Sequence, residues 1–177
     1  LAVSDLLDLL EVPALRRRFG IEGSDLPRLH RWVRGANIRW GLHAEQRASL
    51  DLPAQPDADA QHTWRFGLRR MLLGYAVGAG AVEWRGIEPF DEIGGLDAAL
   101  LGPLARLVEK LDETWRMLRE PASVADWCAR LRALMVDFLD PADSGDAYTL
   151  LQLETALQEW QEVCAEAGLD EALPLAI

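Results

Sequence analysis

The side chains that most often carry out catalysis or bind metals are few and scattered in this 177-residue sequence. Three histidines, His30, His43 and His62, form no HExxH motif and have no closely spaced cysteine partner, so we expect no metal site. Cys128 and Cys164 lie far apart and outside any CxxC motif. We therefore expect neither a disulfide framework nor a zinc site, and both cysteines should behave as small buried apolar residues.

Motifs for nucleotide and acyl-transfer chemistry are also missing. The stretch from Gly74 to Gly80 contains glycines but lacks the lysine of a GxxxxGK[ST] phosphate loop, and no GxSxG motif occurs. The acidic pair Asp91-Glu92 has no nucleophile or basic partner beside it, and helix capping or a salt bridge explains it equally well. The sequence therefore predicts no catalytic residue and no cofactor.

A dense group of arginines in the first quarter of the chain is its most distinctive chemical feature. Residues 16–39 contain seven arginines and only two acidic residues, Glu22 and Asp25, so this stretch has a charge of +5. Such a group can bind phosphates or an acidic protein face, or it can be a solvated surface paired with acidic residues of the same chain. We call these residues the arginine strip: Arg16, Arg17, Arg18, Arg28, Arg31, Arg34 and Arg39.

Two further features extend this set of candidate nucleic-acid-binding residues. Arg65 and Arg69 lie four residues apart and form a second basic helix face. Trp40 follows Arg39 in a predicted connector, and Trp84 occupies a similar place beside Arg85. Either indole could stack on an unpaired base or on a partner protein, or could plug the core beneath its loop. The candidate nucleic-acid contacts are therefore the arginine strip with Trp40, Arg65 and Arg69.

Charge is unevenly distributed along the chain. The net charge of −11 combines 11 arginines and nine acidic residues in residues 1–70 with seven basic and 20 acidic residues in residues 71–177. Half of all residues are apolar and 27% are charged, a balance that excludes an intrinsically disordered chain. No run reaches the roughly 18 uncharged apolar residues of a membrane span, and no signal peptide is evident. We expect a cytoplasmic protein without membrane association.

The composition favours helices. Leu and Ala together number 56, whereas the β-branched residues Val, Ile and Thr number 18. We predict an all-α fold: a compact domain of six or seven helices covering residues 1–177, with possible sub-halves at 1–95 and 96–177. Residues 51–61 contain two prolines and three aspartates, which predicts a mobile loop.

Apolar spacing predicts the buried faces and one helix start. Ser123 with Asp126 is a capping-box variant, and the loop over residues 83–95 should be pinned to the core in part because it holds large apolar side chains. The predicted buried stripes are Leu29, Trp32, Val33 and Ala36 in the helix after Asp25; Trp64, Leu68, Met71, Leu72 and Tyr75 in the helix after Thr63; and Leu150, Leu153, Leu157, Trp160 and Cys164 in the last helix.

Several separate motifs, in the same order along the chain, resemble RecC, the gamma subunit of exodeoxyribonuclease V. The resemblance covers about residues 3–101 and fades afterwards, where only helical character and lengths fit. Its motifs include Leu29-His-Arg-Trp-Val33, Ile38-Arg-Trp-Gly-Leu42, Leu50-Asp-Leu-Pro53, Pro89-Phe-Asp-Glu92 and His62-Thr-Trp-Arg-Phe-Gly-Leu-Arg-Arg-Met-Leu-Leu-Gly-Tyr-Ala76. The chain is similar to an internal segment of that larger subunit, the helical insertion of its second helicase-like lobe.

The resemblance implies a function as well as a fold. It implies a helicase-like subunit that has lost its ATP-binding motifs, held between a helicase–nuclease subunit and a second helicase subunit. That complex unwinds and degrades double-stranded DNA ends and prepares them for recombinational repair. RecC guides DNA within it and takes part in recognising the Chi sequence, although no Chi-reading motif is recognisable here.

Two functional hypotheses follow from the sequence. In the first, the chain is a noncatalytic helical domain of a RecC-like subunit, which scaffolds the complex and guides DNA through the candidate residues above. In the second, it is a protein-interaction module whose acidic half binds a basic partner face and which makes no DNA contact. An independent enzyme is disfavoured by the missing motifs.

Overall fold

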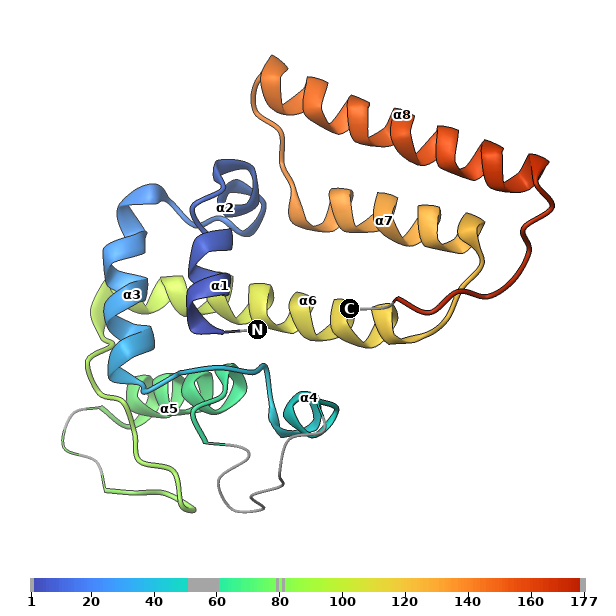
Figure 1. Cartoon of the computed structure of the whole chain (residues 1–177). Coiled ribbons are helices and arrows are strands. Elements are labelled where there is room, and N and C mark those ends of the chain that lie inside the picture. The colour runs from blue at the N-terminus through green and yellow to red at the C-terminus, as the bar shows by residue number, and fades with distance from the viewer. Residues whose placement is uncertain (1, 51–60, 79, 81, 176–177) are drawn as a thin grey trace. The chain divides into compact units, whose positions relative to one another are not determined.

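The computed structural model describes residues 2–50, 61–78, 80 and 82–175, and within them the predicted all-α fold is confirmed (Figure 1). Eight α-helices occur there instead of six or seven, because a short stretch after His43 forms a helix of its own. No strand forms within those ranges. The helices are α1 (Val3–Leu9), α2 (Pro13–Phe19), α3 (Leu26–Gly35), α4 (Ala44–Ala48), α5 (Trp64–Val77), α6 (Leu101–Arg119), α7 (Val124–Phe138) and α8 (Ser144–Glu166), with 3-10 helices η1 (Gly23–Asp25) and η2 (Gly95–Leu100). The predicted mobile loop at residues 51–61 lies outside the described residues except for Gln61.

The chain divides into two compact units, Leu1–Leu111 and Asp112–Ile177. The first unit holds α1 to α5 and the start of α6. The second holds the end of α6 with α7 and α8. All of the candidate DNA contacts lie in the first unit.

The first unit buries one apolar face of α1, α3, α5 and α6. Leu6 of α1, Leu29 of α3, Trp64 of α5 and Leu104 of α6 are fully buried. Removing such a side chain from water contributes about 1.5–3 kcal/mol to folding. The stripe predicted for α3 is confirmed, since Leu29, Trp32, Val33 and the following Ala36 are all buried.

The stripe predicted for α5 is partly wrong. Leu72 and Tyr75 are exposed, whereas Gly67 and Gly74 lie on the buried face with Trp64, Leu68 and Met71. A Cβ at Gly67 would lie 2.2 Å from Cγ1 of Ile38, and one at Gly74 would lie 1.8 Å from the carbonyl oxygen of Phe90. The buried face of α5 therefore contains glycines because neighbouring segments approach the helix too closely for any side chain.

Arg70 of α5 stabilises the contact between this helix and the segment that contains Phe90. Its guanidinium donates to the carbonyl oxygens of Ala36 at 3.0 Å and Glu88 at 2.9 Å and pairs with the Glu88 carboxylate at 3.1 Å. The Phe90 amide donates back to the Arg70 carbonyl at 3.0 Å. Phe90 and Ile93 are buried, which confirms that the loop over residues 83–95 is pinned to the core.

The second unit contains a pair of packed helices, α7 and α8. Ser123 caps α7 as predicted, since its hydroxyl accepts the Asp126 amide at 3.2 Å. The indole of Trp127 donates to the Leu173 carbonyl at 2.8 Å, and Ala122 pairs with Leu173 in an isolated β-bridge. The segment after α8 is thereby fastened to the start of α7.

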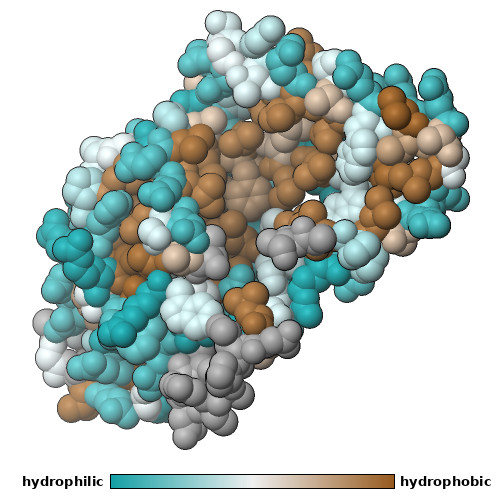
Figure 2. All heavy atoms as spheres, in the orientation of Figure 1, coloured by the Kyte–Doolittle hydropathy of each residue, from teal (hydrophilic) through white to brown (hydrophobic). Residues whose placement is uncertain are grey.

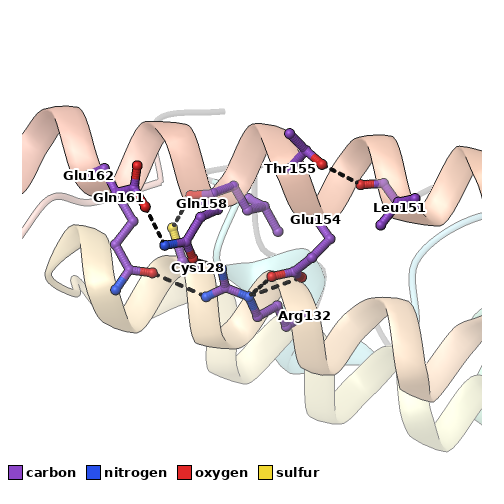
Figure 3. Close-up of polar contacts among 9 residues, drawn as sticks. Cys128, Arg132, Leu151, Glu154, Thr155, Gln158, Gln161 and Glu162 are labelled. Carbon is purple, nitrogen blue, oxygen red and sulfur yellow. Dashed lines mark hydrogen bonds and ion pairs between the residues drawn. The ribbon is translucent and has the colours of Figure 1, made fainter.

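Arg132 of α7 is the polar centre of the contact with α8 (Figure 3). It binds both carboxylate oxygens of Glu154, at 2.8 and 3.0 Å, and donates to the side-chain oxygens of Gln161 at 3.2 Å and Gln158 at 3.4 Å. One turn earlier, the Cys128 thiol lies 3.5 Å from the Leu157 carbonyl oxygen. Burial raises the pKa of this thiol, and Arg132 opposes the rise by favouring the thiolate.

The buried stripe predicted for α8 is wrong at two positions. Leu150, Leu157 and Cys164 are partly buried, but Leu153 is 47% exposed and Trp160 is 39% exposed. The prediction merged two adjacent apolar rows of α8 into one. Only the row that contains Leu150, Leu157 and Cys164 packs on α7.

Gly74→Ala tests the close approach in the first unit. The added methyl group would overlap the main chain of Phe90, so we expect the free energy of unfolding to fall by about 3 kcal/mol in urea titrations. Gly102→Ala in α6 is the matched control, because a Cβ there meets no atom within 4 Å and alanine favours a helix by about 0.5–1 kcal/mol. Equal stability of Gly74→Ala and the unsubstituted chain would contradict this packing.

Candidate nucleic-acid interface

Arg31 and Arg34 are the most available cations of the arginine strip. They occupy the exposed face of α3, whose opposite face is buried through Leu29, Trp32 and Val33. Neither guanidinium makes a hydrogen bond or ion pair with another residue in the described part of the chain. A spacing of three residues places both cations on neighbouring turns of one helix, where they can contact adjacent phosphates.

Arg28, one turn earlier on α3, has carboxylate partners within the first unit. It pairs with Asp25 at 3.3 Å and with Asp97 of η2 at 3.2 Å. These pairs join the start of α3 to the segment before α6. Because two carboxylates already offset its charge, Arg28 is less available to a phosphate than Arg31 or Arg34.

The arginines of α2 differ in burial. Arg16 is half-buried and donates to the Leu10 carbonyl at 2.6 Å, which satisfies an acceptor just beyond the end of α1. Arg17 and Arg18 are exposed. They lie in the last turn of α2, where cations also favour the helix dipole, before Gly20 ends the helix in the left-handed conformation.

Trp40 is already stacked on a cation of the same unit. The Arg47 guanidinium lies 4.1 Å from the centre of the Trp40 ring and donates to the carbonyl oxygens of Trp40 at 2.7 Å and Gln61 at 2.8 Å. Arg47 is buried, so this clamp is part of the core. One face of the Trp40 ring is therefore covered by Arg47. Arg39, the residue before Trp40, is exposed and donates to the Asn37 side chain at 3.1 Å.

Sequence reasoning missed the role of Arg47. A solvated arginine and a buried one look alike in a short polar stretch such as Ala44–Ala48, and no spacing signal marks the difference. Its partners are main-chain carbonyls, which every residue carries. Only the fold brings the carbonyl of Gln61 to this guanidinium.

Arg65 and Arg69 border a cavity of about 210 Å³ beside the first turns of α4 and α5. Thr63 caps α5 by accepting the Phe66 amide at 3.2 Å, and His43 caps α4 by accepting the Gln46 amide at 3.3 Å. Within the described ranges Arg69 has no hydrogen-bond or ion-pair partner. The other lining residues are His43, Ala44, Glu45, Thr63 and Phe66, so one carboxylate lies among the cations.

The ten candidate residues form several groups instead of one patch. Figure 1 shows α2 and α5 at opposite ends of the first unit, with α1 and α6 between them. Arg31 and Arg34 share one face of α3, and Arg65 and Arg69 share one cavity. Each group can meet a phosphate at a separate point along an extended ligand.

Trp84, the other candidate aromatic, is 52% exposed and therefore does not plug the core. It begins a tight turn that ends at Ile87. The amide of each of these two residues donates a hydrogen bond to the carbonyl oxygen of the other at 3.0 Å. Arg85 adopts a left-handed conformation at φ 51°, and its guanidinium lies 4.6 Å from the centre of the Trp84 ring. The turn presents an indole and a cation together to solvent.

The described residues contain no group of three or more His, Cys, Asp or Glu side chains placed to hold a metal ion. Among the helices within these same ranges, none is long and apolar enough to cross a membrane.

Comparison with known proteins settles the family. The family model for the fourth domain of the RecBCD enzyme subunit RecC matches residues 1–177. The chain belongs to the RecC family. The match extends past residue 101, where the resemblance was expected to fade.

Curated relatives agree with this assignment. RecC from Escherichia coli K12 is 40% identical in an alignment of 177 positions that covers 98% of this chain and 15% of that protein. RecC from Mycobacterium tuberculosis H37Rv is 33% identical over 173 residues, 97% of this chain and 15% of the relative. RecC from Haemophilus influenzae is 33% identical over 137 residues, 77% of this chain and 11% of the relative. The chain thus spans about 15% of the length of the first two RecC proteins.

Arg47→Met tests the clamp on Trp40. Methionine keeps an apolar stem but removes the donors to the carbonyls of Trp40 and Gln61, so we expect the free energy of unfolding to fall by roughly 2–3 kcal/mol. Urea unfolding followed by tryptophan fluorescence measures this loss. Arg34→Met, on the exposed face of α3, should change stability by less than about 0.5 kcal/mol. Equal effects of the two substitutions would contradict the structural role of Arg47.

Proposed function

We propose that this chain is a noncatalytic helical domain of a RecC subunit, which helps to hold together a RecBCD-type helicase–nuclease and to guide DNA during recombinational repair of double-strand breaks. Family membership supports the proposal, because the relatives are named as RecC subunits of the RecBCD enzyme. The proposed partners are the helicase–nuclease subunit, the second helicase subunit and, through the whole complex, double-stranded DNA ends. The exodeoxyribonuclease V activity belongs to that complex.

The observation that carries the DNA-guiding role is the exposed pair Arg31 and Arg34. Their helix is held by a buried apolar face, so the backbone beneath the two cations is fixed before any ligand arrives. A phosphate bound there would compete with no carboxylate of the described residues, in contrast to Arg28. Guanidinium groups on a fixed helix, with no partner among the described residues, suit the backbone of DNA and carry no base specificity.

The second unit is unsuited to broad phosphate contact. Residues 112–177 contain 14 acidic residues and four arginines. One of these arginines, Arg132, is engaged by Glu154, and another, Arg116, pairs with Asp112 at 3.1 Å. The proposed DNA contact is therefore confined to the first unit.

A second candidate function is favoured by the same charge distribution. In this alternative the chain is a protein-interaction module with no DNA contact, and its acidic half binds a basic partner face. The exposed apolar residues of α8 fit such a role, as does the acidity of the second unit. The two candidates differ in one measurable quantity, the salt dependence of DNA-end affinity.

Replacing both Arg31 and Arg34 with glutamine tests the DNA contact in the whole complex. Each lost phosphate contact should reduce the slope of log K against log salt by about one, so we expect the slope to flatten by about two and the affinity for duplex ends to fall. Fluorescence anisotropy with a labelled duplex end at several salt concentrations measures both. Arg119→Gln at the end of α6 is the matched control and should leave the slope unchanged.

Unchanged affinity and slope in the double variant would overturn the DNA-guiding role and favour the interaction module. A loss of affinity at constant slope would also count against phosphate contact. An unchanged slope means that the variant releases as many counterions on binding as the unsubstituted complex does.

The noncatalytic part of the proposal has its own test. The purified chain should show neither ATP hydrolysis nor DNA degradation above the buffer rate, in coupled ATPase and end-labelled duplex assays. Turnover that a single substitution in the chain abolishes would contradict the proposal, because contaminating enzymes would not respond to that substitution.

A further inference from the structure

Helix α8 carries two apolar rows, and only one of them is covered within the described residues. The inner row, which packs on α7, contains Leu150, Leu157 and Cys164. The second row, which we call the outer row, consists of Leu153, Ala156, Trp160 and Val163. Its spacing of three, four and three residues keeps all four on one side of the helix.

All four residues of the outer row are exposed. Leu153 is 47%, Trp160 39% and Val163 64% exposed, and Ala156 is exposed as well. Figure 2 shows hydrophobic side chains among hydrophilic ones along α8 on the face turned toward the viewer. A spacing of alternating three and four residues is the pattern by which one helix packs along another, and a central tryptophan is typical of an interface anchor.

The charges beside the outer row indicate the chemistry of its occupant. Glu159 and Glu166 each lie three or four residues from Val163 and are exposed. Residues 133–177 contain ten acidic residues and no lysine or arginine. A second copy of this chain would bring the same acidic charge to the contact, whereas an occupant with lysine or arginine beside an apolar row would be complementary.

We propose that the outer row of α8 binds a basic amphipathic helix of a partner subunit, whose apolar residues pack around Trp160 and whose Lys or Arg side chains pair with Glu159 and Glu166. The chemistry of the occupant follows from α8 alone. Its assignment to another subunit rests on the proposed function, because the relatives are subunits of a multi-subunit enzyme.

Substitutions in the full-length subunit test the contact energetically. Trp160→Ala should weaken binding of the partner subunit at least tenfold in biolayer interferometry, because the central anchor is lost. Replacing Glu159 and Glu166 with glutamine should weaken it severalfold and flatten its salt dependence. Leu151→Ala is the matched control, since Leu151 is 59% exposed but lies on another side of α8, and it should leave binding unchanged. Equal binding by the Trp160→Ala, glutamine and control variants would overturn the proposal.

A photo-cross-linking residue at position 163 identifies the occupant directly in the assembled complex. The expected product joins this subunit to a lysine- or arginine-rich helical peptide of another subunit, and the same residue at position 151 should give no such product. A cross-link within the same polypeptide, to a second copy or to DNA would overturn the assignment, as would no cross-link. These outcomes do not depend on Arg31 and Arg34, so this inference and the DNA-guiding role fail separately.

Discussion

The first unit depends on a close approach between α5 and the main chain at Phe90. Gly74 allows it by having no side chain, and Arg70 secures it by binding the carbonyls of Ala36 and Glu88. These two residues connect the end of α3, the middle of α5 and the loop that leads to α6. Because α3 carries Arg31 and Arg34, the position of the candidate phosphate contacts depends on a packing contact that contains no functional residue.

Arginine has two different uses in this chain. Arg16, Arg47, Arg70 and Arg132 bind main-chain carbonyls or carboxylates and are half-buried or buried, so they act as parts of the core. Arg31 and Arg34 stand on an exposed helix face. A planar guanidinium with five donors suits the first use because it can bind several oxygens in one plane, and it suits the second because it never loses its charge.

The sequence predicted the helices better than it predicted their buried faces. The stripe of α3 and the Ser123 cap were predictable because bulky apolar residues and a capping side chain act locally. Gly67 and Gly74 were missed because a hydropathy pattern assigns burial to large apolar residues, whereas a close contact requires the smallest one. Leu153 and Trp160 were misplaced because two apolar rows on one helix look like one wide row until a neighbouring helix distinguishes them. For the candidate site, the sequence identified the cations but not which of them have internal partners.

The arrangement of oxygens around Arg132 also limits how α8 can slide. Glu154, Gln158 and Gln161 are spaced along one line of the helix, but only Glu154 bears a charge. A shift of α8 by one turn would exchange this carboxylate for a neutral amide and leave a partly buried guanidinium without its counterion. The ion pair therefore favours one register of the helical hairpin, and with it one position of Trp160 along α7.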